Sequence, residues 1–141
     1  TRSPLPHSAS ALVALRVQPN PASRRSMGDL NNYFSRSEFE CPCGCGYDTV
    51  DALLLEALRE IRIWFKAPVR INSGARCRAH NESVGGALRS QHRFARAADI
   101  VVDGVPPDDD ADYAEDLGLS VGRYDTFTHV DTRSGPPARW S

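Results

Sequence analysis

The hydrophobic positions that follow residue 49 have the period of a helix. Apolar side chains recur at spacings of four, three and four residues, at Leu54, Leu58, Ile61 and Phe65. That spacing places them on one stripe of an amphipathic helix. Asp51 can cap the first turn, because a carboxylate accepts backbone N–H groups that have no partner inside the helix. Pro68 ends the pattern, since proline lacks a backbone N–H. We therefore predict a helix between Asp51 and Pro68.

Further segments predict β-strands and loops. The strand segments are 67–72 (APVRIN), 97–104 (AADIVVDG) and 123–133 (RYDTFTHVDTR). Alternation in the last segment would place Phe127, His129 and Asp131 on one face of a single strand. Residues 73–90 are polar and contain glycine, which predicts a long loop with room for one helical turn, and such loops are often functional. An acidic stretch that ends at Gly118 predicts a short helix. This mixture predicts the α+β fold class.

The first part of the chain has a different composition. Residues 1–26 contain four prolines, four arginines, many serines and no sustained period. They predict a flexible N-terminal arm, followed by one folded domain over residues 27–141.

Composition and charge narrow the classes of partner. The chain of 141 residues carries 17 basic and 18 acidic side chains, for a net charge of −1. This balance gives no overall attraction to a polyanion, so we expect no nucleic-acid partner. No apolar run approaches the ~20 residues that span a bilayer, and no secretory pattern is visible near the start. We expect a monomer with no membrane span, and the compartment stays open.

Four cysteines, Cys41, Cys43, Cys45 and Cys77, allow three interpretations: disulfides, a structural metal site or reduced thiols. Their C-x-C-x-C arrangement differs from the usual C-x2–4-C spacing of zinc sites. We favour a disulfide between the 41–45 group and Cys77, which would suit an extracellular enzyme. No cysteine has the sequence context of a catalytic nucleophile.

His92, Asp99 and His129 are candidate metal ligands. Zinc in a hydrolytic site takes three protein ligands from His, Asp, Glu or Cys and leaves the fourth position for water. Neighbouring strands could bring Asp99 and His129 together, with His92 arriving from the preceding loop. The alternative is a packed histidine and a carboxylate that opens a strand, because the spacing H-x6-D is less specific than a paired CxxC motif.

Several motifs in order resemble one enzyme family. The segment SQHRFARAADI is similar to the S-x-H-x-x-G-x-A-x-D signature of the zinc D-Ala-D-Ala carboxypeptidase and murein endopeptidase family, whose fold the Hedgehog domain shares. Ala95 stands where that signature has glycine. INSGARCRAHN resembles the family's I-x-S-G-Y-R-x-x-x-H-N loop, and FTHVDTRSGPPARW resembles its closing F-x-H-V-D strand with a basic-Trp ending. The likeness covers roughly residues 27–141.

The resemblance implies a small antiparallel sheet packed with helices and a zinc peptidase domain over residues 27–141. It implies one catalytic Zn²⁺ ion held by His92, Asp99 and His129. The substrate would be the stem peptide or cross-bridge of bacterial peptidoglycan, cut next to D-alanine. The alternative is a non-catalytic zinc-containing module on the same fold, which binds cell wall or forms part of a virion.

Other residues receive roles beside these ligands. Asp131 lies two positions from His129, and we expect it to serve as the general base; the alternative is that it orients that histidine. Asp125 is a weaker candidate, because some branches of the family place an acid three positions before the last histidine, where this chain has Thr126. Arg76 matches the arginine of the SGYR loop and can bind a carboxylate or an oxyanion. Ser90 can bind substrate or cap its turn. His80 and Asn81 resemble the HN pair, which we expect to stabilise the loop, and His80 is a spare candidate ligand.

Overall fold

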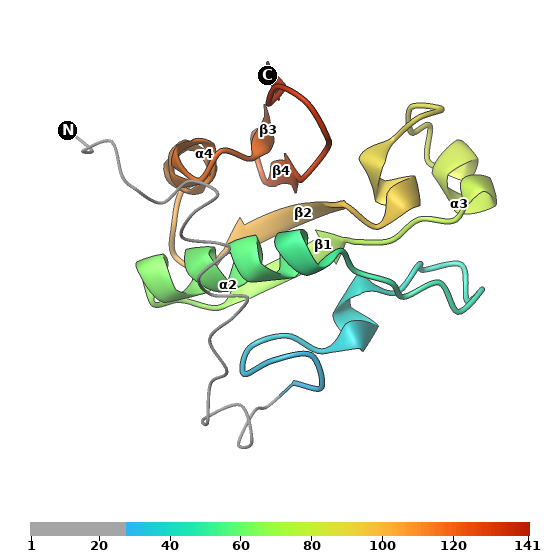
Figure 1. Cartoon of the computed structure of the whole chain (residues 1–141), viewed down its shortest axis with the longest axis horizontal. Coiled ribbons are helices and arrows are strands. Elements are labelled where there is room, and N and C mark those ends of the chain that lie inside the picture. The colour runs from blue at the N-terminus through green and yellow to red at the C-terminus, as the bar shows by residue number, and fades with distance from the viewer. Residues whose placement is uncertain (1–27) are drawn as a thin grey trace.

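The computed structural model of the protein describes residues 28–141, and the arm expected at 1–26 lies outside them. Helices and strands are mixed along the chain, which confirms the α+β class (Figure 1). The helices are α2 (Ala52–Phe65), α3 (Arg78–Ser83) and α4 (Pro107–Asp116), with 3-10 helices η2 (Arg36–Phe39) and η3 (Gln91–Phe94). The strands are β1 (Val69–Ser73), β2 (Ala97–Val102), β3 (Ser120–Arg123), β4 (Thr128–Asp131) and β5 (Arg139–Trp140). None of the helices within residues 28–141 has the length and apolar character to cross a membrane.

The five strands form one sheet in the order β1-β2-β4-β3-β5. Strands β1, β2, β4 and β3 pair antiparallel, as expected, whereas β5 pairs parallel to β3, so the sheet is mixed. The reason lies in the connection after β4. The chain reverses direction over residues 132–138 and returns along the outer edge of β3, so it runs in the same direction as that strand.

Helix α2 follows the predicted hydrophobic stripe. The Asp51 carboxylate caps it by accepting a hydrogen bond from the Leu54 backbone N–H at 3.2 Å. Leu54, Leu58 and Ile61 are fully buried, while Phe65 is half-buried and packs edge-on against Tyr113. The helix ends at Lys66, which has a left-handed backbone conformation, two residues before Pro68. The predicted helix is therefore confirmed, with bounds slightly inside the expected ones.

The single strand predicted over residues 123–133 is wrong. The segment contains the end of β3, a turn over 124–127 and the whole of β4. The turn is closed by a hydrogen bond from the Tyr124 backbone N–H to the Phe127 carbonyl at 3.2 Å, and the two rings stack. Phe127 therefore lies in the turn, outside the hydrophobic core, although His129 and Asp131 do share one face of β4.

One row of residues crosses the whole sheet at a common register. Ser73 pairs with Asp99, Asp99 with His129, His129 with Gly122, and Gly122 with Trp140. Residues in register point to the same face of a sheet, and their neighbours along each strand point to the other. Those neighbours include Ala98, Ile100, Val121 and Val130, which belong to the core beneath α2 and α4. The polar row consequently lies on the face opposite that core.

Asp110 of α4 is a buried carboxyl group away from this polar face, with 1% of its surface exposed. The Thr128 hydroxyl lies within hydrogen-bond distance of both the Asp110 carboxyl and the Pro107 carbonyl. One hydroxyl hydrogen cannot serve both acceptors, so a protonated Asp110 that donates to Thr128 satisfies all three groups. Burial, together with the nearby carboxylate of Asp109, raises the pKa of Asp110 to about 7, although the Thr128 hydroxyl, which can donate to the ionised carboxylate, acts to lower it.

The raised pKa of Asp110 predicts a stability that depends on pH. The folded state binds the Asp110 proton more tightly than the unfolded chain does. Protonated Asp110 therefore stabilises the folded state fully below pH ~4, and this stabilisation is lost as the pH rises through 7. Asp110→Asn removes the titration. Its free energy of unfolding at pH 8 should exceed that of the native protein, by up to ~4 kcal/mol, and the advantage should vanish near pH 4. Urea denaturation across this pH range measures the difference.

A control variant separates this effect from a general change in charge. Asp125→Asn removes an exposed carboxylate from the turn between β3 and β4 and should change the free energy of unfolding by less than ~0.5 kcal/mol at either pH. Equal stability of Asp110→Asn and native protein at pH 8 would contradict the assignment of a protonated Asp110.

Candidate metal centre

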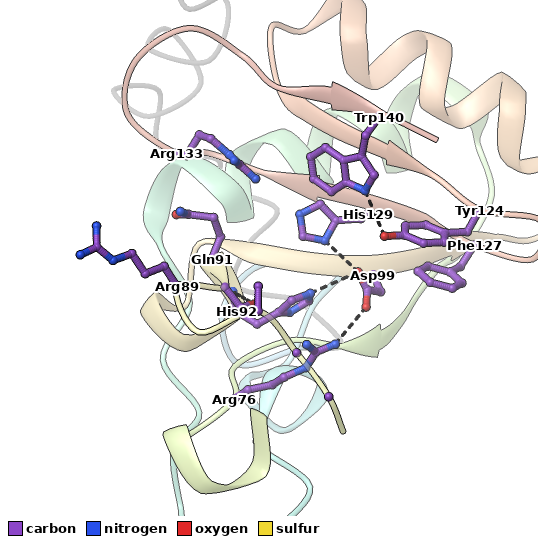
Figure 2. A pocket seen from close by; sticks show the side chains of 14 residues that line it. Arg76, Arg89, Gln91, His92, Asp99, Tyr124, Phe127, His129, Arg133 and Trp140 are labelled. Carbon is purple, nitrogen blue, oxygen red and sulfur yellow. Dashed lines mark hydrogen bonds and ion pairs between the residues drawn. The ribbon is translucent and has the colours of Figure 1, made fainter. Parts of the chain in front are cut away.

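His92, Asp99 and His129 converge at one point of the polar sheet face (Figure 2). One potential ligand atom from each residue lies within 4.8 Å of the others. Asp99 Oδ1 is 3.2 Å from His92 Nε2 and 3.1 Å from His129 Nδ1. The three side chains are buried, which is unusual for polar groups unless they are paired or hold an ion. The group predicted from the sequence is thus brought together.

Different elements deliver the three side chains. Asp99 and His129 face each other across the β2–β4 pairing. His92 comes from η3, whose N-cap is Ser90: the Ser90 hydroxyl oxygen accepts a hydrogen bond from the His92 backbone N–H at 3.2 Å. The 3-10 helix ends at Ala95, which adopts a left-handed conformation with φ of 59°. That conformation favours glycine, the residue expected at this position of the signature.

The partners of each imidazole decide which nitrogen faces Asp99 with a lone pair. His92 Nδ1 lies 2.8 Å from the Gly74 carbonyl oxygen, which can only accept, so this nitrogen carries the hydrogen. His129 Nε2 lies 2.7 Å from Asp131 Oδ2, which likewise accepts a hydrogen. In the neutral rings the remaining nitrogens, His92 Nε2 and His129 Nδ1, direct lone pairs toward the Asp99 carboxylate. Three acceptor atoms that face one another require a cation between them.

Electrostatics support the same conclusion. Burial acts to raise the pKa of the Asp99 carboxyl, but the imidazoles of His129 and His92, which donate to it when they carry a second proton, outweigh burial and hold that pKa well below its usual range. Burial acts to lower the pKa of His129, yet hydrogen bonds with Asp131 and Asp99 raise it above its ordinary value. The centre therefore favours positive charge, as a proton or as a metal ion, and the two compete for the same lone pairs. The donor set of two imidazoles and one carboxylate fits a divalent metal ion.

Asp131 lies behind His129 and is fully buried. Besides the contact with His129, it accepts two side-chain hydrogen bonds from Arg133, at 2.9 Å from Nε and 2.7 Å from Nη2. Burial acts to raise the pKa of Asp131, whereas the hydrogen bonds from Arg133 and His129 hold it well below its usual range. The carboxylate is thus ionised, and its two oxygens are hydrogen-bonded to His129 and Arg133. It does not line the cavity in front of the centre.

Arg76 approaches the centre from the loop after β1. Its Nη2 lies 3.3 Å from Asp99 Oδ2, and its Nε donates to the Ser73 hydroxyl at 3.0 Å. Asn81 is buried and fixes the same loop: its amide Nδ2 donates to the Ala87 carbonyl at 2.8 Å. Asn81 therefore stabilises the loop as expected. Arg76 leaves Asp99 Oδ1 free for the two imidazoles.

A cavity of about 490 Å³ opens in front of the three candidate ligands. Arginine and aromatic side chains line much of it: Arg76, Arg89, Arg133, Tyr124, Phe127 and Trp140. The Trp140 indole donates to the Tyr124 hydroxyl at 3.0 Å, and its ring centroid lies 5.0 Å from that of His129 (Figure 2). Tyr124 and Trp140 thus form part of the cavity wall beside His129.

Some residues beside the centre had no clear signal in the sequence. Arg133 lies two residues after Asp131, just as Asp131 lies two residues after His129. This spacing was the only feature of the sequence that could have placed Arg133 beside the centre. Gly122 carries no chemistry, yet a Cβ atom there would lie 2.4 Å from Trp140 Cε2, so glycine is needed for the indole to pack beside His129. Gln91 also lines the cavity.

Other candidates lie apart from the centre. Asp125 is exposed in the turn between β3 and β4 and does not line this cavity, and His80 lies on α3 outside the group of ligands. The four cysteines form a separate group, and all are free thiols. Cys43 Sγ lies 3.5 Å from Cys77 Sγ with no bond between them, and the disulfide to Cys77 stays a prediction.

Comparison with known proteins connects this geometry to a family. No curated protein matches the chain. A family model described as Peptidase M15 matches residues 32–131, a range that contains all three candidate ligands together with Arg76 and Asp131. Since the match spans well over half of the chain and includes the whole centre, the protein belongs to the Peptidase M15 family.

Proposed function

We propose that the protein is a zinc-dependent metallopeptidase that hydrolyses peptide bonds of bacterial peptidoglycan, next to D-alanine. The observation that carries the proposal is the set of three lone pairs, on His92, Asp99 and His129, fixed toward one point in a Peptidase M15 domain. Three protein ligands with a cavity in front are the arrangement of a catalytic zinc site, whereas structural sites are closed by four ligands.

Zinc is the metal that best suits this donor set in a hydrolytic enzyme. When bound, it supplies Lewis-acid chemistry, lowering the pKa of water toward ~7 and polarising a carbonyl group. The protein's own residues supply position and charge. Gly74 and Asp131 hold the two imidazoles in the required tautomers, and Arg76 holds the carboxylate of Asp99.

The charge and shape of the cavity favour the end of a peptide as substrate. Its volume of about 490 Å³ lies in the range of small-molecule sites. Guanidinium groups bind carboxylates, and aromatic rings pack against the apolar parts of a peptide. A stem peptide that ends in D-alanine offers both a terminal carboxylate and small methyl groups. Arg76 is our candidate for binding substrate or a developing oxyanion, and Ser90, which lines the cavity, for a substrate hydrogen bond.

We infer that Asp131 orients His129. The contacts support this role, because the carboxylate is buried behind the imidazole and is bonded to Arg133. The alternative role of general base would require Asp131 to reach the cavity.

One observation favours a second function, a cell-wall binding module without turnover. Among the described residues, the cavity is lined by no carboxylate other than Asp99, so no free general base faces it. Tight binding of the zinc-loaded protein to purified peptidoglycan, without release of any fragment, would support this second function over hydrolysis.

Metal dependence is the first expected property. Treatment with a chelator should abolish the release of D-alanine or of peptide fragments from purified peptidoglycan, and added zinc should restore it. His129→Ala should lower kcat/KM at least ~10³-fold, because the metal provides several kcal/mol of transition-state stabilisation. His80→Ala, which removes a histidine outside the centre, should retain native activity. Hydrolysis that continues in excess chelator would rule out a metal mechanism.

Asp131→Asn distinguishes the two roles of that residue. If Asp131 orients His129, the variant should bind zinc 10- to 100-fold more weakly, and excess zinc should restore most of kcat. If Asp131 is the general base, zinc affinity should stay native while kcat is lost without rescue. Zinc titration and steady-state kinetics on the same preparation measure both quantities. Asp125→Asn is the matched control, and a loss of kcat in that variant alone would make Asp125 the base.

Gly122→Ala tests the role of the Trp140 wall. The added methyl group would displace the indole from its place beside His129. We expect KM for a peptide substrate to rise about 2- to 10-fold, the loss of one aromatic contact, with little change in zinc affinity. In a Trp140→Ala background the same substitution should have no further effect, since the two residues act through one contact. Independent, additive effects would contradict this coupling.

A further inference from the structure

The four cysteines gather into a second cluster, separate from the His–Asp centre. Cys41 and Cys43 precede and enter a tight loop, Cys45 follows within it, and Cys77 comes from the loop after β1. The sulfur atoms all lie within 4.8 Å of one another. Cys41 is buried, Cys77 is half-buried, and Cys43 and Cys45 are exposed. Residues separated by more than 30 positions thus bring four soft donor atoms to one point.

The distances among three of the sulfur atoms, those of Cys41, Cys43 and Cys77, match a tetrahedral thiolate site. They are 3.5 Å for Cys41–Cys43, 3.8 Å for Cys41–Cys77 and 3.5 Å for Cys43–Cys77. A disulfide bond would require ~2.05 Å. Zinc binds thiolates at ~2.3 Å, so the sulfur atoms of a tetrahedral site with four cysteine ligands lie ~3.8 Å apart. The observed separations are therefore close to those of a metal site and far from those of a disulfide.

The loop geometry explains how C-x-C-x-C can supply three ligands. Gly44 and Gly46 have left-handed conformations, with φ of 83° and 88°. The chain turns sharply at each glycine, as residues with a Cβ rarely can. The turn is closed by a hydrogen bond from the Cys41 backbone N–H to the Tyr47 carbonyl at 2.8 Å. This curvature brings the three sulfur atoms to one side, although the spacing is shorter than that of usual zinc motifs.

Backbone amides point at two of the sulfur atoms. The Cys77 N–H donates to Cys41 Sγ at 3.4 Å, and the His80 N–H donates to Cys77 Sγ at 3.3 Å. Such bonds stabilise negative charge on sulfur, which is the state that binds a metal ion. Four thiolates so close together would repel one another strongly without a cation.

We propose that Cys41, Cys43, Cys45 and Cys77 bind a second zinc ion, in a closed structural site. Four thiolates leave no position for water, which distinguishes this site from a catalytic one. The proposal does not depend on the hydrolytic function, because it rests on a different set of residues.

The second site would hold the loop that carries Arg76. Beside Cys77, the Ala75 backbone N–H donates to the Phe39 carbonyl at 2.8 Å, and Gly74 contributes the carbonyl that fixes His92. At the other end of the cysteine loop, the Tyr47 hydroxyl donates to the Arg93 carbonyl at 2.7 Å, next to His92. An ion at the cysteines would therefore connect the N-terminal segment to both sides of the His–Asp centre.

Zinc content of the purified full chain, measured by mass spectrometry after preparation under reducing conditions, tests the proposal. We expect two zinc ions per native chain. The double variant Cys43→Ser/Cys45→Ser, which changes the two exposed cysteines, should retain one, and His129→Ala should also retain one. If the native chain and His129→Ala each bind one ion while the cysteine variant binds none, the cysteine site stands and the His–Asp centre fails. If His129→Ala binds no zinc, the cysteine site is overturned.

Cobalt substitution tests the ligands without changing any cysteine. Co²⁺ added to metal-free His129→Ala protein should give a thiolate-to-cobalt charge-transfer band and the intense visible bands of tetrahedral cobalt. Thiol titration of the unfolded, chelated native chain should count four free thiols. Absence of the charge-transfer band, or a thiol count of two or fewer from disulfide formation, would overturn the proposal.

Discussion

The register of β2 against β4 is the constraint on which the site depends. Asp99 lies opposite His129 in this antiparallel pairing, so both side chains point to the polar face of the sheet. A slip of one residue would turn either side chain into the core beneath α2 and α4. That core makes the register strict, because Ile100 and Val130 would be exposed by the same slip. Hydrophobic packing on one face thus fixes polar chemistry on the other.

Burial of the two carboxylates has different consequences for each. Taking a charge out of water costs several kcal/mol unless partners compensate. The negative charge of Asp131 is compensated by hydrogen bonds with Arg133 and His129, so neither carboxylate oxygen is left to bind an ion or a substrate. Asp99 is compensated on Oδ2 by Arg76 only, while Oδ1 faces two imidazole nitrogens. Asp131 and Asp99 carry the same chemical group, and their neighbours alone make Asp131 a supporting residue and Asp99 a candidate ligand.

Sequence patterns predicted those features that depend on local spacing. The period of α2 and its cap at Asp51 are local, and His92, Asp99 and His129 follow from ordered motifs. The turn between β3 and β4 was missed because residues 124–127 contain no glycine or proline and continue the alternation. Gly122 and Arg133 were missed because their roles are contacts with Trp140 and Asp131 in the folded chain. The cysteine cluster depends on two left-handed glycines, which a rule based on ligand spacing does not include.

The segment between β1 and β2 is fixed to the domain at its two ends and is free to vary in sequence between them. It begins at Gly74, where a Cβ atom would lie 2.7 Å from the Phe39 Cα, and it ends at Ala95, whose carbonyl accepts the Asp51 backbone N–H at 2.8 Å. Both ends are thus fixed to the rest of the domain, next to the residues that hold the imidazoles. Between them, residues 82–89 are exposed apart from Gly86, so packing constrains this part of the cavity wall less. Substitutions there can alter which peptide fits while the geometry set by the sheet is preserved, because loops tolerate change that paired strands do not.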